Sequence, residues 1–218
     1  MYKYLWAVKS DDMEDKKDHI LKMAENLFAV NGFKGTTTRM IAQESKVNLG
    51  TLTYYFGNKE DLFKELIKKR IGFYKTNIKE KLLQHKVGYM DLILEIGDIY
   101  VDHMMSNIAF HRIMNKEIMT NSDSEAAKFA TTHIIENRKQ LASIVNKAIQ
   151  KKEIRKIDTD MFLNSLIGTI LHMANTESMT LKIMGQDPKK DKINNHKNTK
   201  RIKTFIRDYI SVYLNPSF

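Results

Sequence analysis

The sequence contains no cysteine and few of the residues that form turns, with nine glycines and two prolines among 218 residues. The absence of cysteine excludes disulfide bonds, thiol catalysis and thiolate metal ligands. A β-rich or loop-rich fold needs many turn-forming residues, so their scarcity favours helices. No apolar run approaches the ~20 residues that cross a bilayer, and the apolar stretch at the start is too short for a secretion signal. We therefore expect a cytoplasmic protein that does not enter a membrane.

Positive charge exceeds negative charge, because 36 Lys and Arg stand against 26 Asp and Glu and give a net charge of +10. This excess favours an anionic partner, and nucleic acid and acidic membrane surfaces both fit it. Hydrophobic residues make up 42% of the chain, an ordinary share for a globular protein. Their spacing of three and four residues predicts an all-α fold of about nine helices without strands. The first ten residues lack this period and indicate an arm, and residues 185–200 indicate a polar, basic, solvated loop.

Residues 36–59 are the part of the sequence that points to a function. They predict a short helix, a turn at residues 45–48 that Asn48 closes as the cap of the next helix, and a second short helix. We expect Gly32 to end the helix before this segment and Asn58, with Asp61, to cap the helix after it. The residues expected in the core are Ile41, Ala42, Val47, Leu52 and Phe56. This arrangement is a helix-turn-helix, whose second helix can lie in the DNA major groove. The outer face of that second helix carries small and hydroxyl-bearing residues where a solvated helix would show Lys and Glu. Such residues suit close approach to base edges and thymine methyl groups.

Several spaced positions agree with one known family at once. They are Thr37-Thr38-x-x-Ile41-Ala42, Val47, Gly50-Thr51-Leu52, Tyr55-Phe56 and Lys59-Glu60-x-Leu62, preceded by the apolar pattern of residues 20–33. Together they resemble the TetR family of bacterial transcriptional regulators over about residues 14–65. The resemblance implies an N-terminal three-helix DNA-binding domain at residues 14–74 and a C-terminal helical domain for effector binding and dimerisation at residues 75–218. Our hypothesis for the mechanism is that an effector bound in the C-terminal domain favours a dimer whose two reading helices no longer match the operator spacing.

The resemblance also implies site residues and partners. The positions that match base contacts are Arg39, Leu49, Gly50, Thr51 and Thr53. The positions that match phosphate-contacting or positioning residues are Thr38, Tyr54, Tyr55 and Lys59. The implied partners are a palindromic double-stranded DNA operator, a second copy of the chain and a small-molecule effector. We expect the helices at 158–182 and 198–214 to pair with their mates in a homodimer.

The chain departs from the family pattern at two positions. Lys46 stands in the turn where the family usually has glycine, and a non-glycine residue held at positive φ costs about 1 kcal/mol. Thr53 stands where tyrosine is common, so the operator sequence cannot be taken from relatives.

The C-terminal half gives weaker signals about an effector. Its methionines suit a hydrophobic effector, although ordinary core filling is the commoner use of this residue. The candidate effector-binding residues are Tyr100, Met104, Phe110, His133 and His172. An acidic stripe could receive a cationic effector, but we favour a solvated face paired with the basic helix before it; the stripe is Asp91, Glu95, Asp98 and Asp102.

We expect neither a metal nor a cofactor. His103 and His111, with Glu117 nearby in the sequence, could be considered as metal ligands, but core or rim histidines are commoner than ligands. The sequence has no Gly-rich phosphate loop, no Ser-His-Asp pattern and no paired-carboxylate motif. An enzyme is therefore not expected.

Three functions stay open. The favoured one is a dimeric repressor that a small molecule releases from its operator. The second is a DNA-binding protein of the same fold that answers to a protein partner or to no effector, and a regulatory domain without a ligand cavity would favour it. The third is a helical enzyme with a relic helix-turn-helix, which would need an active site in residues 80–218.

Overall fold

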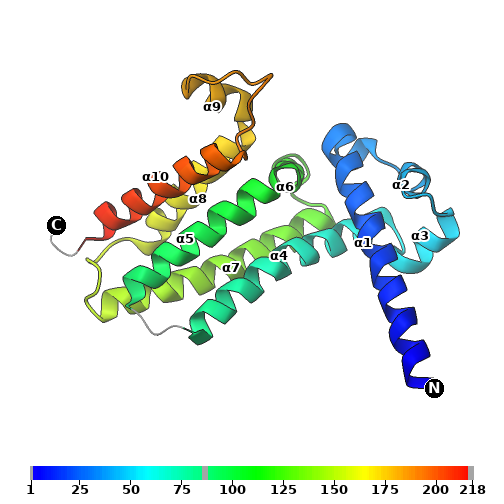
Figure 1. The fold of residues 1–218 in the computed structure, drawn as a ribbon, viewed down its shortest axis with the longest axis horizontal. Helices are drawn as coiled ribbons and strands as arrows, with labels where there is room; N and C mark the ends of the chain where they lie inside the picture. The colour runs from blue at the N-terminus through cyan, green and yellow to red at the C-terminus, as the bar shows by residue number, and fades with distance from the viewer. Residues whose placement is uncertain (1, 85–87, 216–218) are drawn as a thin grey trace. The chain divides into compact units, whose positions relative to one another are not determined.

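The computed structural model describes residues 2–84 and 88–215, and within these ranges it contains ten helices and no strand (Figure 1). The all-α prediction is confirmed, with one helix more than expected. The helices are α1 (Tyr2–Gly35), α2 (Thr38–Glu44), α3 (Leu49–Phe56), α4 (Lys59–Gln84), α5 (Tyr89–Ser106), α6 (Ile108–Thr120), α7 (Glu125–Gln150), α8 (Thr159–Asn175), α9 (Glu177–Ile183) and α10 (His196–Leu214). None of them, as far as the chain is described, is long and apolar enough to span a bilayer.

Packing divides the chain into two units. Unit 1 contains the chain up to Arg70 together with Ala109–Thr131, and unit 2 contains Ile71–Ile108 and the chain from Thr132 onward. By packing, most of α6 and the start of α7 belong with the N-terminal helices, although the resemblance assigns them to the C-terminal domain. The domain limits at 14–74 and 75–218 stay a proposal.

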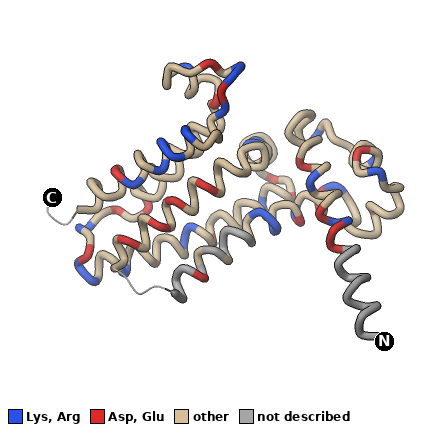
Figure 2. Tube along the Cα trace, viewed as in Figure 1, with Lys and Arg blue, Asp and Glu red and all other residues tan. Residues whose placement is uncertain are grey.

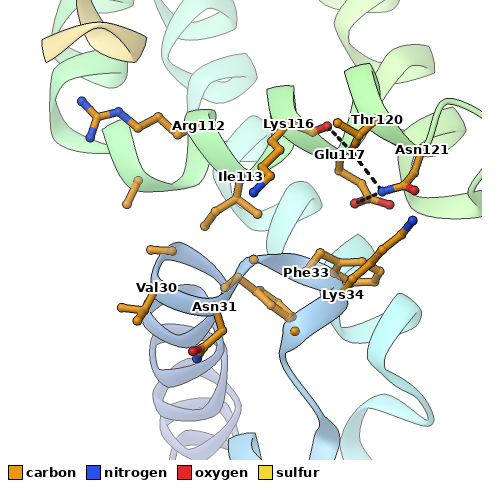
Figure 3. Close-up of a pocket in the computed structure, with 15 residues that line it drawn as sticks. Val30, Asn31, Phe33, Lys34, Arg112, Ile113, Lys116, Glu117, Thr120 and Asn121 are labelled. Atoms are coloured by element: carbon orange, nitrogen blue, oxygen red, sulfur yellow. Dashed lines mark hydrogen bonds between the residues drawn. The ribbon is translucent and has the colours of Figure 1, made fainter.

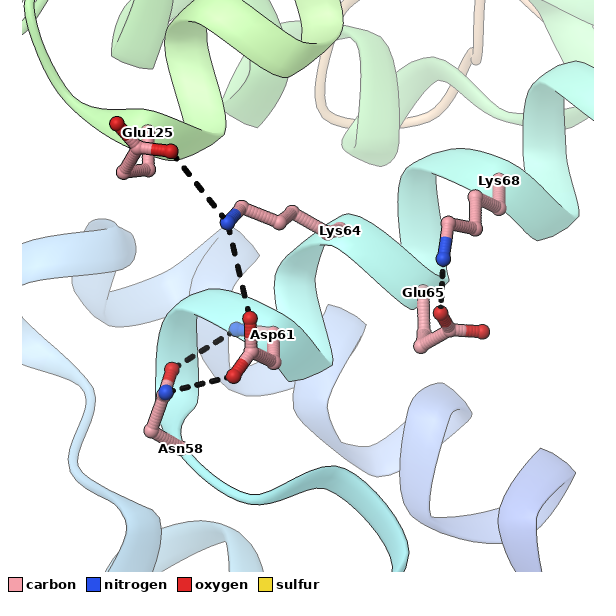
Figure 4. Close-up of polar contacts among 6 residues, drawn as sticks. All are labelled: Asn58, Asp61, Lys64, Glu65, Lys68 and Glu125. Atoms are coloured by element: carbon pink, nitrogen blue, oxygen red, sulfur yellow. Dashed lines mark hydrogen bonds and ion pairs between the residues drawn. The ribbon is translucent and has the colours of Figure 1, made fainter.

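Side-chain caps set where the short helices of unit 1 begin. The Thr37 hydroxyl accepts a backbone N–H of α2, and the Asn48 Oδ1 accepts the N–H of Thr51 in α3 at 2.7 Å. At the start of α4 the Asn58 Oδ1 accepts the N–H of Asp61 at 2.9 Å, and the Asn58 amide donates to the Asp61 carboxylate at 2.6 Å (Figure 4). Each cap satisfies a backbone donor that the first helical turn leaves unpaired. The caps predicted at Asn48 and Asn58 are confirmed.

The prediction for α1 is wrong at its N-terminal end and agrees with the structure near its C-terminal end. The helix begins at Tyr2, so the arm predicted for the first ten residues is wrong. Near the other end Gly32, the predicted stop, has a φ of 74° and interrupts the regular helix. Glycine adopts this left-handed conformation without a Cβ clash, which is why it serves as a helix stop.

Unit 2 is built around α5 and α10, which lie side by side (Figure 1). The two helices approach closely at Gly97, where a Cβ would lie 3.0 Å from the Ile210 Cδ1. Buried apolar side chains of α5, α7, α8 and α10 fill the core of this unit, with Leu92, Phe162 and Ile206 among its most buried members.

The acidic stripe of α5 faces α10. Asp98 pairs with Arg207 at 2.9 Å, and Asp102 pairs with Lys203 at 2.5 Å; the two helices carry these charges along their lengths (Figure 2). The predicted partner, the basic helix before the stripe, is therefore wrong for these two carboxylates. Exposed pairs of this kind add only a few tenths of a kcal/mol each, so they fix register more than they stabilise.

Thr176 divides the helix that the sequence predicts at 158–182. Its φ of −109° and ψ of 37° are not helical, and its hydroxyl donates to the His172 carbonyl at 2.7 Å. The same hydroxyl lies 3.1 Å from that of Thr180, so a local side-chain network competes with the helical backbone. The expected continuous helix is α8 followed by α9.

The basic segment at 185–200 is tied to the fold and is not a free solvated loop. Asn198 is fully buried, and its amide exchanges two hydrogen bonds of 2.7 Å with the Gln186 amide. Asn198 also donates to the Lys192 carbonyl at 2.9 Å, and Ile193 is fully buried in the core of unit 2. The residues that make these contacts are Gln186, Lys192, Ile193 and Asn198. They follow no regular spacing within the basic segment, so no sequence pattern predicts them.

The turn between α2 and α3 contains Lys46 at a φ of 55°. The strain inferred from its departure from the family pattern is therefore present. The Lys46 side chain is exposed, and its backbone N–H donates to the Gln43 carbonyl at 3.1 Å.

Replacing Lys46 with glycine is expected to stabilise the protein by about 0.5–1 kcal/mol, because glycine removes the Cβ clash at positive φ. The matched control is Lys22→Gly on the exposed face of α1, which should destabilise by about 1 kcal/mol, as glycine does inside a helix. Urea unfolding, monitored by circular dichroism, shows whether each variant is more or less stable than the parent protein. If the urea midpoint of Lys46→Gly falls as far as that of Lys22→Gly, the backbone at Lys46 is not strained.

Candidate nucleic-acid interface

The exposed face of α3 is small, hydroxyl-bearing and aromatic. Tyr54 is 78% exposed and Leu49 is 41% exposed, and Gly50 and Thr53 are exposed as well. Thr51 is half-buried. The face thus has no charged residue and can approach another surface closely, which is the requirement for contact with base edges.

The opposite faces of α2 and α3 anchor both helices in unit 1. Four residues predicted as core are buried: Ile41, Ala42, Leu52 and Phe56. Val47, the fifth residue predicted as core, is half-buried in the turn. These side chains orient the exposed face of α3 and do not take part in it.

Two cations precede α3 in the helix-turn-helix. Arg39 on α2 and Lys46 in the turn are exposed, and neither has an ion-pair partner among the described residues. Thr38, at the start of α2, is half-buried. Unpaired cations in the same helix-turn-helix as an uncharged reading face suit contact with phosphates.

Two tyrosines stand at the C-terminal end of α3. Their ring centroids lie 5.4 Å apart in an edge-to-face arrangement, and the Lys17 ammonium lies 6.0 Å from the Tyr55 centroid. Tyr54 projects into solvent and Tyr55 is half-buried. The Thr53 hydroxyl donates to the Leu49 carbonyl at 3.0 Å, so both of its lone pairs remain for an incoming donor.

Lys59 holds the helix-turn-helix to the end of α1. Its ammonium donates to the carbonyls of Phe33 at 2.8 Å and Thr36 at 2.9 Å, and it lies 4.5 Å from the centroid of the Phe33 ring. Burial lowers the pKa of this ammonium, while the carboxylates of Glu117 and Glu60 oppose that shift. Of the two roles that the resemblance gave Lys59, the structure supports positioning.

The Lys59 contacts rest on a rigid base. Thr36 is fully buried, and its hydroxyl lies within hydrogen-bond distance of the Gly32 carbonyl at 2.9 Å and the Leu27 carbonyl at 3.2 Å. The rings of Phe28, Phe33 and Phe63 pack with centroids 5.0 to 5.4 Å apart. Aromatic contacts at this spacing add to the burial of the rings themselves.

The start of α7 contacts α4 within unit 1. Lys64 lies 3.7 Å from Asp61 on its own helix and 3.8 Å from Glu125, while Lys68 pairs with Glu65 at 2.5 Å (Figure 4). The Lys64–Glu125 contact joins residues 61 positions apart, and no periodicity or motif signals it.

The candidate effector residues do not come together. Unit 2 has an apolar pocket of about 30 Å³ between α5, α7 and α8, and Tyr100 lines it with side chains such as Leu141 and Phe162. Burial raises the pKa of the Tyr100 hydroxyl far above its ordinary value, against a smaller opposing effect of Arg138. A volume of this size holds about one water molecule.

The other four effector candidates do not line this pocket. Met104 is buried in the core, His133 is half-buried, and His172 is exposed on α8, which corrects the expectation of a polar anchor in an apolar cavity. Phe110 is fully buried but packs in unit 1. Helical spacing placed these residues on faces and could not tell which faces enclose a space.

Among the described side chains, no group of three or more His, Asp or Glu residues is placed to hold a metal ion. His103 and His111 are both buried.

Comparison with known proteins gives a family match at the helix-turn-helix segment and several similar regulators. Residues 20–66 match the sequence model described as "Bacterial regulatory proteins, tetR family". The HTH-type transcriptional regulator HbdR of an Aromatoleum species is 32% identical over 77 residues, which cover 34% of each chain. The HTH-type transcriptional regulator QacR of Staphylococcus aureus is 45% identical over 51 residues, which cover 23% of this chain and 27% of QacR. The match thus spans a third or less of these curated relatives.

Solved structures extend the likeness to the whole fold. The transcriptional regulator FadR from Bacillus subtilis, determined in complex with stearoyl-CoA, superposes with a TM-score of 0.69. The superposition covers 88% of this chain and 96% of FadR at 19% sequence identity, which shows a shared fold and no more.

Lys59→Met is expected to destabilise the protein by about 1–3 kcal/mol, because it leaves the Phe33 and Thr36 carbonyls without their charged donor. The shift of the urea midpoint measures the loss. Lys34→Met is the matched control, because Lys34 is an exposed lysine of the same unit whose ammonium has no hydrogen-bond or ion-pair partner among the described residues; this variant should stay within about 0.5 kcal/mol of the parent protein. Equal midpoints for the two variants would show that Lys59 does not position the helix-turn-helix.

Proposed function

We propose that this chain, a member of the TetR family of bacterial regulatory proteins by its helix-turn-helix segment, is a transcriptional regulator that binds a DNA operator as a homodimer. The observation that carries the proposal is the uncharged exposed face of α3, in a helix-turn-helix that also exposes the unpaired cations Arg39 on α2 and Lys46 in the turn. A solvated helix of a structural bundle has no need of such a face, whereas a helix in the major groove does.

The residues of this face divide by the chemistry they offer. Leu49 can contact a thymine methyl group, and the hydroxyls of Thr51 and Thr53 can exchange hydrogen bonds with base edges. Gly50 has no side chain and permits close approach of the backbone. Arg39, Thr38, and the hydroxyls of Tyr54 and Tyr55 suit the phosphates that fix register.

A second copy of the chain is needed because one short helix reads about half of a typical site. The exposed faces of α8 and α10 support this part of the proposal. Met161 is 60% exposed, Phe205 is 49% exposed and Val212 is 63% exposed, and Gly168 leaves α8 bare at its middle. Apolar exposure on two long helices of one unit is typical of a surface that another subunit covers.

Release by a hydrophobic effector is the favoured form of regulation. The pocket around Tyr100 is apolar with one hydroxyl, and FadR, which shares the fold, was determined with stearoyl-CoA bound. The small volume of the Tyr100 pocket, about 30 Å³, favours the second candidate, a regulator that answers to a protein partner or to no effector. Stearoyl-CoA added to the DNA complex separates the two, because release by this probe supports the effector and unchanged binding supports the alternative.

Tyr54→Ala is expected to weaken specific DNA binding at least about tenfold, because one lost contact to DNA amounts to about 1–3 kcal/mol. The measurement is a titration against the DNA upstream of the protein's own coding region, in the presence of competitor DNA. Met119→Ala is the control, since Met119 is 84% exposed in the same unit and lies outside the interface.

Both titrations are run at two salt concentrations, because phosphate contacts make the affinity depend steeply on salt. Saturable binding that the Tyr54 variant loses and the Met119 variant keeps is the expected result. Weak binding that salt abolishes equally in all three proteins would contradict operator recognition by α3.

Gly168→Arg is expected to convert the dimer to a monomer without unfolding the chain. A Cβ at Gly168 meets no atom within 4 Å in the single chain, so the arginine blocks only the surface that a partner would cover. Gly72→Arg is the matched control, because a Cβ there also meets no atom within 4 Å. Sedimentation equilibrium measures both masses. A Gly168→Arg protein that remains dimeric would exclude the face of α8 as the interface.

A further inference from the structure

Unit 1 contains a pocket that shares no residue with the exposed face of α3. It has a volume of about 410 Å³ and lies between the last turns of α1 and one face of α6 (Figure 3). Small-molecule sites in proteins commonly have volumes of about 300–1,000 Å³, so this space is large enough for a ligand. Both walls belong to the same packed unit.

The charged residues of this pocket are mostly cations. Lys34, Arg112 and Lys116 line it, and the ammonium groups of Lys34 and Lys116 have no carboxylate partner among the described residues. In Figure 3 the Lys116 side chain points from α6 toward the end of α1. A Cβ on Gly32 would lie 3.9 Å from the Lys116 ammonium nitrogen, which places that charge over the helix end.

The carboxylate in the lining is already engaged. Glu117 is 5% exposed, and its two oxygens accept from the Asn121 amide at 2.9 Å and from the Ser124 hydroxyl at 3.1 Å. Glu117 is therefore buried with one hydrogen bond to each oxygen and is poorly placed to meet a cationic ligand, whereas the ammonium groups of Lys34 and Lys116 are open donors for an anion. An ammonium has three N–H donors, so Lys116 can offset the dipole at the end of α1 and still donate to a ligand.

The rest of the lining is mixed, with the polar residues Asn31, Thr120 and Asn121 beside several apolar side chains. Val30 is 84% exposed at the rim, and Phe33 and Ile113 form part of the walls (Figure 3). Phe33 and Ile113 are only 8% and 6% exposed, so an apolar body would remove mainly the surface of Val30 from water, at about 25 cal/mol per Å². The combination of free ammonium groups and an apolar wall selects a ligand that is itself both anionic and apolar.

We propose that this pocket is a binding site for small organic anions with an apolar body, such as an aromatic carboxylate. Lys34 and Lys116 bind the carboxylate, and Val30, Phe33 and Ile113 contact the ring. The site goes beyond the proposed function, because it lies in the unit of the helix-turn-helix and shares no residue with the pocket around Tyr100. Its binding is measured without DNA, so its failure would leave the operator proposal untouched.

Isothermal titration of the full-length protein with benzoate tests the site, with benzamide as the neutral probe of the same shape. The expected result is benzoate binding at one molecule per chain with a Kd of about 1 mM, and benzamide binding at least about tenfold weaker. No benzoate binding up to about 10 mM, or equal affinity for the two probes, would overturn the proposal.

A charge-matched pair of double variants locates the site. Lys34→Gln with Lys116→Gln is expected to weaken benzoate binding at least about tenfold, because both charged donors are lost. Lys189→Gln with Lys190→Gln removes two exposed lysines from unit 2 and should leave the affinity unchanged. Circular dichroism confirms that both proteins are folded. Equal benzoate affinities in the two variants would assign the binding to overall charge and overturn the site.

Discussion

One ammonium group fixes the part of this protein that matters most for its proposed activity. The Lys59 side chain bonds to two backbone carbonyls at the end of α1 and lies over the Phe33 ring, so the start of α4 and the end of α1 cannot separate without leaving a charge unpaired. Because α2 and α3 lie between these two points in the chain, their placement depends on this contact. The exposed face of α3 is aimed by a residue that need not touch DNA.

Short-range features of the fold were predictable from the sequence. Helical spacing identified Ile41, Leu52 and Phe56 as core, and all three are buried. Asn48 and Asn58 were identifiable as caps because a cap acts on a donor two or three residues away. The helix-turn-helix follows from these local rules, and family resemblance adds the roles of its exposed residues.

Features that join distant parts of the chain were beyond the sequence. Asp98 gave no sign that its partner is Arg207, and Lys64 gave none that its partner is Glu125. Thr176 interrupts a continuous apolar pattern through a side-chain network that propensity does not register. For the same reason the sequence could not tell which effector candidates share a pocket, since a helical face is a property of one helix and a cavity is a property of several. Packing decides these features, and only three-dimensional structure reports packing.

The strained turn at Lys46 affects how the proposed DNA binding would depend on salt. Glycine at position 46 would relax the backbone but would offer no charge, whereas lysine at a φ of 55° carries an exposed cation next to α3. If that cation meets a phosphate, it displaces a condensed counterion, and the slope of log K against log salt steepens by about 0.9. In the proposed complex with DNA, the residue at position 46 would thus trade a relaxed backbone for an affinity that depends more steeply on ionic strength.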